Sequence, residues 1–121
     1  MDIFEKITDA LADILDVDPM EITPETYLIR DLEAESIDLL ELAVVLNSEF
    51  KIDVDDDEMF LKTLRIYLDD PKKNHEDDTE EYLIDKYPYL TKDRIKEILS
   101  DLDDGPVLKV KDLVSYIEWK D

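Results

Sequence analysis

The sequence predicts an all-α protein, because its apolar residues recur at helical spacing in several separate stretches. Stripes at i, i+3, i+4 and i+7 occur near both termini and in the middle of the first half. Helix-breaking pairs, Asp18-Pro19 and Gly105-Pro106, stand between stripes. The one alternating stretch, Lys51–Val54, is too short to require a strand. These observations favour a bundle of amphipathic helices.

A first helix is expected directly after Asp2, whose carboxylate can cap it, with Glu5 in the first turn. Its apolar positions are Ile3, Phe4, Ile7, Leu11, Ile14 and Leu15. A long connection runs from Asp16 to Glu35, and loops of this length need buried anchors or a function to stay ordered. Its apolar residues are Ile22, Tyr27, Leu28 and Leu32.

The second helix is expected from about Ser36 to Phe50, and it has two distinct faces. The core stripe is Leu39, Leu42, Ala43, Leu46 and Phe50. At about 100° per residue the opposite face carries acids with apolar residues set among them. These are Asp38, Glu41, Val45 and Glu49, with Ile37 and Val44 beside them. Such a face is typical of a helix that docks on a partner. Ser36 lies at the N-terminus, where a serine most often caps the helix.

A third helix is expected after the acids Asp55–Glu58, with apolar residues Met59, Phe60, Leu61, Leu64, Tyr67 and Leu68. Asp53, Asp55 and Asp57 have the spacing of a calcium-binding loop. That loop needs glycine where Glu58 stands and glutamate where Leu64 stands, so no metal site is predicted.

Residues 69–81 contain no apolar residue except Pro71, so they are interpreted as a solvated linker. The only histidine, His75, falls there and is expected to be exposed and inert. Thr79 can cap a short helix with Tyr82, Leu83, Ile84 and Tyr87, which Pro88 ends. Thr91 can cap another with Ile95, Ile98, Leu99 and Leu102. A last helix carries Val110, Leu113, Val114 and Ile117.

Composition limits the possible functions. The 121 residues suit one domain, and 35 acids against 14 bases give a net charge of −21. This charge disfavours nucleic-acid partners and favours basic ones. The absence of cysteine excludes disulfides and thiolate sites. No segment is long and apolar enough to span a membrane, so a cytoplasmic protein without stable membrane insertion is expected.

One run of residues resembles the prosthetic-group site of acyl carrier proteins, whose core pattern is Asp-Ser-Leu followed by Asp. The matching residues are Asp31-Leu32, Glu35-Ser36-Ile37-Asp38 and Glu41-Leu42. Glu35 and Ile37 depart from the pattern but keep its charge and its apolar character. The turn Phe50–Glu58 and the last helix, Val110–Ile117, also resemble that family.

The resemblance implies that Ser36 carries 4′-phosphopantetheine, transferred from coenzyme A by a phosphopantetheinyl transferase. The protein would then be a monomeric phosphoprotein of fatty-acid or other lipid biosynthesis, and not itself an enzyme. It would hold acyl intermediates as thioesters for acyl-loading and acyl-transferring enzymes with basic docking patches. The expected docking residues are Glu35, Ile37, Asp38, Leu40, Glu41, Val44 and Glu49. The expected acyl-chain lining is Phe4, Leu42, Leu46, Ile52, Val54, Met59, Leu113 and Ile117.

The resemblance covers residues 1 to about 60 and about 107 to 121. We therefore expect a single acyl-carrier-like domain over residues 1–121, with a helical insertion of about 61–106 between the third and last helices. Asn47 and Ser48 stand where the family usually has acids. The insertion and this altered face favour a specialised lipid, lipopolysaccharide or polyketide pathway.

A different hypothesis remains open from the sequence. The chain could be an acidic helical adaptor that binds basic proteins without a prosthetic group, in which Ser36 is only a helix cap. An enzyme is disfavoured, because the sequence offers one unpartnered histidine, no cysteine and no glycine-rich loop.

Overall fold

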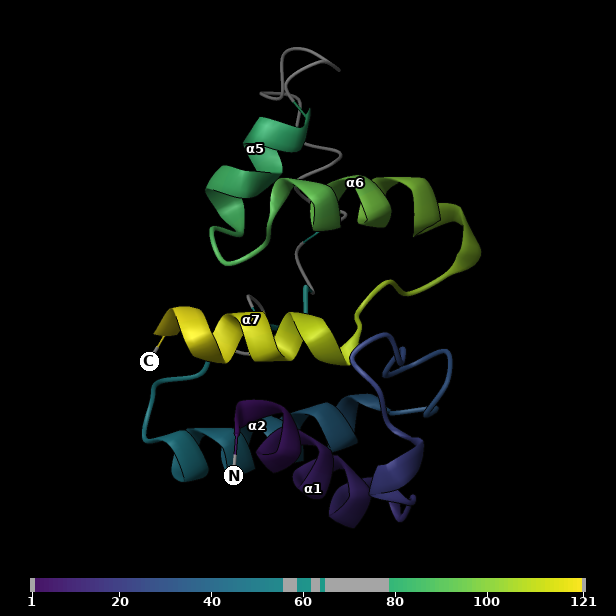
Figure 1. Ribbon diagram of the computed structural model, residues 1–121, viewed down its shortest axis with the longest axis vertical. Coiled ribbons are helices and arrows are strands. Elements are labelled where there is room, and N and C mark those ends of the chain that lie inside the picture. Colours follow the sequence, from purple (N-terminus) through teal and green to yellow (C-terminus); the bar gives the residue numbers. More distant parts are fainter. Residues whose placement is uncertain (1, 56–58, 62–63, 65–78, 121) are drawn as a thin grey trace.

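The computed structural model describes residues 2–55, 59–61, 64 and 79–120. These residues form α-helices and short 3-10 turns and contain no strand, although an isolated antiparallel bridge joins Tyr27 and Lys109. The all-α prediction is confirmed. In Figure 1 the last helix crosses the middle of the molecule. The first two helices lie on one side of it, and the two helices formed within residues 79–101 lie on the other. No helix in the described ranges is long and apolar enough to cross a membrane.

Helix α1 (Ile3–Leu15) begins as the sequence predicts, since the Asp2 carboxylate accepts the Glu5 N–H at 2.8 Å. It ends at Asp16, which adopts a left-handed conformation with φ 56°. The Asp18 carboxylate then accepts the Met20 N–H at 2.9 Å and starts the 3-10 turn η1 (Pro19–Glu21). Local caps at Asp2 and Asp16 therefore fix both ends of α1.

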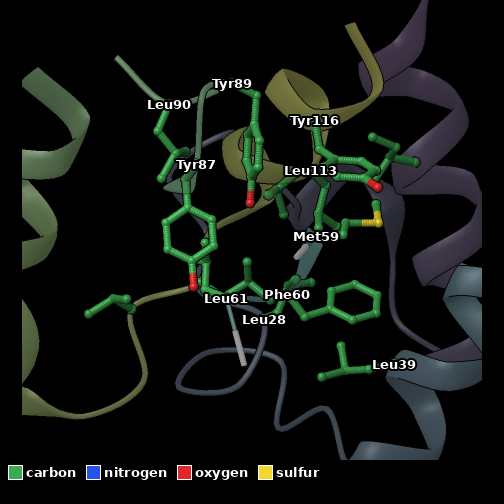
Figure 2. Packing of buried hydrophobic residues seen from close by; sticks show 14 of the residues in the cluster. Leu28, Leu39, Met59, Phe60, Leu61, Tyr87, Tyr89, Leu90, Leu113 and Tyr116 are labelled. Carbon is green, nitrogen blue, oxygen red and sulfur yellow. The ribbon is translucent and has the colours of Figure 1, made fainter. Parts of the chain in front are cut away.

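Helix α2 (Ser36–Phe50) has the predicted boundaries, and Lys51 ends it with φ 55°. Leu39, Leu42 and Leu46 bury its inner face, which packs on α1. Of the predicted third helix, Met59, Phe60, Leu61 and Leu64 are described, and all four are buried. Figure 2 shows three of them among Leu28, Leu39 and Leu113. Tyr67 and Leu68 lie outside the described residues, as does His75 in the predicted linker.

Two further helices follow, as expected: α5 (Thr79–Lys86) and α6 (Lys92–Asp101), which continues into the 3-10 turn η3 (Leu102–Asp104). The Thr91 hydroxyl accepts the Arg94 N–H at 3.1 Å, so the predicted cap of α6 is confirmed. The solvated linker was predicted for residues 69–81, but its last three residues, Thr79–Glu81, are already part of α5.

Helix α7 (Val110–Lys120) holds the fold together, because it packs on α1 through one face and meets the α5–α6 region through another (Figure 1). The Asp112 carboxylate, 1% exposed, accepts from Arg94 Nε at 2.7 Å and from Arg94 Nη2 at 2.8 Å. Tyr89, which lies between α5 and α6, packs edge-on against Tyr116 with ring centroids 5.1 Å apart. A buried ion pair and an aromatic contact thus fix α6 on α7.

Candidate functional site

The loop that leads into α2 is pinned by backbone hydrogen bonds. The Leu28 N–H donates to the Leu108 carbonyl at 3.1 Å, and the Ala34 N–H donates to the Leu28 carbonyl at 3.1 Å. Leu28 and Ala34 are buried, and Glu33 between them takes a left-handed conformation with φ 58°. Buried anchors therefore order this long loop and set the direction in which the chain enters α2.

Ser36 is the first residue of α2 and is exposed. Glu35 is the N-cap, and the Asp38 carboxylate accepts the Glu35 N–H at 2.9 Å. Within the described ranges, the Ser36 hydroxyl makes no hydrogen bond. The interpretation of Ser36 as a helix cap is therefore wrong, because Glu35 is the N-cap and forms a capping box with Asp38.

The outer face of α2 presents large apolar side chains to solvent. Ile37 and Val44 are each 68% exposed and Leu40 is 51% exposed. Burial is the usual state of such side chains, and three of them on one helix form a patch suited to a partner. Three of the seven docking residues expected from the sequence, Ile37, Leu40 and Val44, are therefore exposed on one helix.

The acids of that face differ in what they contact. Asp38 is half-buried and occupied with the helix cap, and Glu49 lies 3.7 Å from Lys6 Nζ on α1. Glu35 and Glu41 are exposed and have no ion pair in the part of the chain that the structure describes. Glu41 is therefore the carboxylate of this face that neither an ion pair nor the capping box engages among the described residues, whereas Glu35 is exposed but takes part in the capping box with Asp38.

A cavity of about 520 Å³ opens beside Ser36. Its lining comes from the loop before α2, the first turn of α2, the buried third-helix residues and the segment between η3 and α7. The lining residues are Ile29, Ser36, Leu39, Phe60, Leu61, Leu64, Leu102, Gly105, Pro106, Val107 and Leu108. Most of these side chains are apolar, and Ser36 is the only hydroxyl among them.

None of the eight residues expected to line an acyl site borders this cavity. Leu42, Leu46, Met59, Leu113 and Ile117 are fully buried instead, and Phe4, Ile52 and Val54 are half-buried beside the core. Helical periodicity correctly identified these positions as inward-facing, and they form the core or pack beside it. Periodicity cannot predict where the packed side chains leave a cavity.

One wall of the cavity is the segment between η3 and α7, and Arg30 binds this wall and the end of α6 through hydrogen bonds. Its guanidinium donates to the Asp101 carboxylate at 3.0 Å, to the Asp101 carbonyl at 3.0 Å and to the Gly105 carbonyl at 2.9 Å. The Tyr27 hydroxyl donates to the same carboxylate, and together with Arg30 it holds the pKa of Asp101 below its usual value. Gly105 has φ 125°, and a Cβ there would lie 3.3 Å from Arg30 Nε. The close approach of Arg30 thus depends on glycine.

Comparison with known proteins agrees with this geometry. The profile of the family described as the phosphopantetheine attachment site matches residues 5–65. An acyl carrier protein of Thermosynechococcus vestitus is 41% identical over 69 residues, which cover 56% of this chain and 85% of the relative. One of Picosynechococcus sp. is 45% identical over 56 residues, covering 46% of this chain and 69% of the relative. An acyl carrier protein of Clostridium acetobutylicum is 45% identical over 56 residues, which cover 46% of this chain and 73% of the relative. The chain belongs to the acyl carrier protein family. No solved structure matches it.

The cofactor of this carrier is 4′-phosphopantetheine, attached covalently, as membership of the family requires. The residues at the start of α2 fit such a group. The Ser36 hydroxyl is exposed and unengaged among the described residues, and it stands at a helix N-terminus, where a phosphate is electrostatically favoured. A largely apolar cavity opens beside it.

Sequence reasoning named Tyr27 only as an apolar residue of the loop, and it missed Arg30 and the cavity wall of residues 102–108. The signal for the wall was the apolar pair Val107-Leu108 placed before the last helical stripe, which is unusual for a solvated connection. No sequence pattern pairs Arg30 with Asp101, because the two residues are brought together only by the packing of α6.

Proposed function

We propose that this carrier holds acyl groups as thioesters on 4′-phosphopantetheine attached to Ser36. The observation that carries the proposal is that Ser36, the exposed first residue of α2, has a hydroxyl without a hydrogen bond in the described ranges. Glu35 and Asp38 form the capping box at this helix end. The family match over residues 5–65 includes this position.

Attachment requires coenzyme A and a phosphopantetheinyl transferase. Ser36 Oγ forms a bond to the phosphorus that bears the pantetheine, and the pyrophosphate bond of coenzyme A breaks. Adenosine 3′,5′-bisphosphate leaves, and the hydroxyl proton passes to a base of the transferase. Once bound, the group supplies a thiol on a long flexible arm, which raises the effective concentration of an acyl group at a docked enzyme.

Loading with an acylated donor tests the carrier role. The apo protein is incubated with octanoyl-coenzyme A and a broad-specificity transferase, and its intact mass should rise by one acyl-phosphopantetheine. Neutral hydroxylamine should then remove the acyl group and leave the arm, because it cleaves thioesters and spares phosphodiesters. Ser36→Ala should abolish the gain, whereas Ser48→Ala, which changes an exposed serine at the other end of α2, should not. Equal loading of Ser36→Ala would contradict the proposal.

Docking on partner enzymes is proposed for the exposed apolar patch Ile37, Leu40 and Val44 together with Glu35 and Glu41. Exposure and unpaired charge support these five, whereas the carboxylates of Asp38 and Glu49 already have intramolecular partners.

Glu41→Lys should slow association with the transferase at low salt, since charges steer encounter more than they add affinity. Glu21→Lys makes the same charge change on exposed η1 and should have a smaller effect. Equal effects would indicate that only net charge matters.

We further propose that residues 1–121 form one carrier domain in which about 61–106 are an insertion, and that the carrier serves a specialised lipid, lipopolysaccharide or polyketide pathway. Helices α5 and α6 and the replacement of acids by Asn47 and Ser48 support this. The test is elongation of the malonyl- and acyl-loaded carrier by ordinary fatty-acid synthase enzymes, with a short carrier as control. Equally efficient elongation would contradict the specialised role.

A further inference from the structure

We propose that residues 102–106, which we call the strap, are a specificity-determining part of the surface on which the phosphopantetheinyl transferase docks. This inference rests on the proposed attachment at Ser36. It adds to the α2 face a second side of the docking surface, made by residues beyond the family match at 5–65. The partner that fits is a transferase with a recess for the strap and basic side chains facing it.

The strap lies beside the attachment point. Its residues Leu102, Gly105 and Pro106 line the same cavity as Ser36. In Figure 1 the loop that enters α2 and the segment that joins η3 to α7 lie at the same end of the molecule. The cavity volume of about 520 Å³ corresponds to a space about 10 Å across, roughly the diameter of one α-helix. An enzyme that reaches Ser36 therefore meets the strap within that distance.

The size of a docking surface brings the strap into it. Transfer requires the phosphorus of coenzyme A to come within about 3–3.5 Å of Ser36 Oγ, so the transferase must close over this residue. A protein–protein interface of standard size covers about 800 Å² of each partner, a patch roughly 30 Å across. Contact on all sides of the reacting atoms is what excludes water. A patch centred on Ser36 therefore extends along α2 and across the strap, whereas docking on α2 alone leaves Ser36 at its edge.

The strap presents a surface that fits a basic protein. Asp103, Asp104 and Pro106 are exposed, and the two carboxylates make no ion pair with any residue that the structure describes. With Glu41 on α2, they place acids on both sides of Ser36. Such charges attract basic side chains of the transferase, and not coenzyme A, whose phosphates are negative. The position beside Ser36 gives these acids their role, since exposed acids elsewhere on this chain are merely solvated.

The strap is held rigidly at both ends. Arg30 donates to the Asp101 carbonyl at 3.0 Å and to the Gly105 carbonyl at 2.9 Å. Arg94, which is 6% exposed, donates to the Val107 carbonyl at 2.7 Å. A surface that is ordered before binding loses little conformational freedom when a partner docks. A fixed strap therefore favours a transferase of matching shape and disfavours one that has no room for it.

Exposed positions at the opposite end of the molecule provide matched controls. Glu118 borders a groove together with Phe50, the last residue of α2. Ser36 is the first residue of that helix, about 20 Å away along its axis. Pro88 precedes Tyr89, whose ring packs against Trp119 with centroids 5.9 Å apart. Glu118 and Pro88 are therefore exposed residues near the end of α7 that is remote from the strap.

The first experiment tests charge. The apo protein is modified by a broad-specificity transferase with coenzyme A, and KM and kcat for the carrier are measured from intact mass at about 10 mM and about 150 mM NaCl. Asp104→Lys should raise KM about fivefold at low salt, the value of a strong exposed ion pair, with kcat nearly unchanged. The effect should shrink at the higher salt concentration, which screens the charges. Glu118→Lys makes the same charge change and should raise KM less than about twofold.

The second experiment tests shape in the same assay. Pro106→Trp enlarges an exposed side chain of the strap and should raise KM roughly tenfold, a usual cost of overfilling a packed contact. This increase should persist at the higher salt concentration, because it is steric. Pro88→Trp should leave KM nearly unchanged. Circular dichroism and thermal melting establish that the variants fold, and Asp104→Trp with Glu118→Trp as control replaces the proline pair if either does not.

The contrary results are distinct. Equal increases in Asp104→Lys and Glu118→Lys, together with equal effects of the two tryptophans, would mean that the strap has no special place in docking. If no strap variant changes KM, the transferase docks on α2 alone and the inference is overturned. Failure of the folded wild type to gain phosphopantetheine rejects the attachment at Ser36 itself, which separates that result from the first two.

Discussion

Capping and the proposed modification fall on different residues at the start of α2. Asp38 accepts the Glu35 N–H, and Ser36 offers an exposed hydroxyl without a hydrogen bond among the described residues. A serine that capped its own helix would lose a stabilising contact on modification, whereas this one loses none. The attachment proposed at Ser36 would therefore not weaken the helix that presents it.

Ser36→Ala should therefore change the free energy of unfolding by less than about 0.5 kcal/mol, the range of surface substitutions. Asp38→Ala should cost about 1 kcal/mol, because it removes the capping acceptor and a favourable charge from the first turn. Urea unfolding of both variants measures the difference. A larger loss for Ser36→Ala than for Asp38→Ala would contradict this assignment of the cap.

The buried Arg94–Asp112 ion pair predicts that removing one partner costs more stability than replacing both. Asp112→Ala leaves the buried guanidinium unpaired and should cost about 3–5 kcal/mol, whereas the double variant Arg94→Met, Asp112→Leu should recover much of that loss. Chemical unfolding of both variants checks it. A double variant as unstable as Asp112→Ala would mean that the hydrogen bond from Arg94 to the Val107 carbonyl is the larger contribution.

At the scale of elements, α6 and α7 are joined to the loop before α2 by surface charges. The Glu25 carboxylate accepts from Lys109 Nζ at 2.8 Å and from Lys111 Nζ at 2.9 Å, and Lys111 also reaches Glu97 at 3.0 Å. Hydrogen bonds from Lys109 and then Lys111 lower the pKa of Glu25 from 4.5 to about 2. One carboxylate thus links the loop to the start of α7.

Because the pKa of Glu25 is lower in the folded state than in the unfolded state, its stabilising contribution is complete above the unfolded value of 4.5 and disappears as the pH falls to about 2. Unfolding by urea at pH 7, 5 and 3 should show wild type more stable than Glu25→Gln at pH 7 and 5, with the difference shrinking by pH 3. The effect should be modest, since the Glu25 side chain is 61% exposed. A difference that grows towards low pH would contradict this account.

What the sequence could predict follows from the range of each interaction. Periodicity and local capping residues predicted where α1, α2 and α6 begin and which apolar residues α1, α2, α6 and α7 carry, because both act within one or two turns. Ile37 and Val44 were predicted on the outer face for the same reason, whereas Leu40 was expected there only from the family resemblance. The cavity and its Arg30–Asp101 contact were not predictable, because residues 71 positions apart meet there through packing alone. The Ser36 cap was misjudged because two acids compete for the same helix end.

Charge acts on the whole molecule. A net charge of −21 on 121 residues favours expansion by self-repulsion, which salt screens. Raising NaCl from about 10 mM to about 150 mM, which shortens the Debye length from roughly 30 Å to roughly 8 Å, should raise the melting temperature. The rise should be a few degrees, since about 1 kcal/mol shifts the midpoint by roughly 4 °C at this size. A fall would show that ion pairs such as Lys111–Glu97 outweigh the repulsion.

Attachment at Ser36 is tested most directly by mass spectrometry after incubation with coenzyme A and a broad-specificity transferase. We expect a gain of one phosphopantetheine per chain, with fragmentation placing it on Ser36 and no gain in Ser36→Ala. A phosphopantetheine found on another residue, or a folded wild-type protein that gains none from any active transferase, would contradict it.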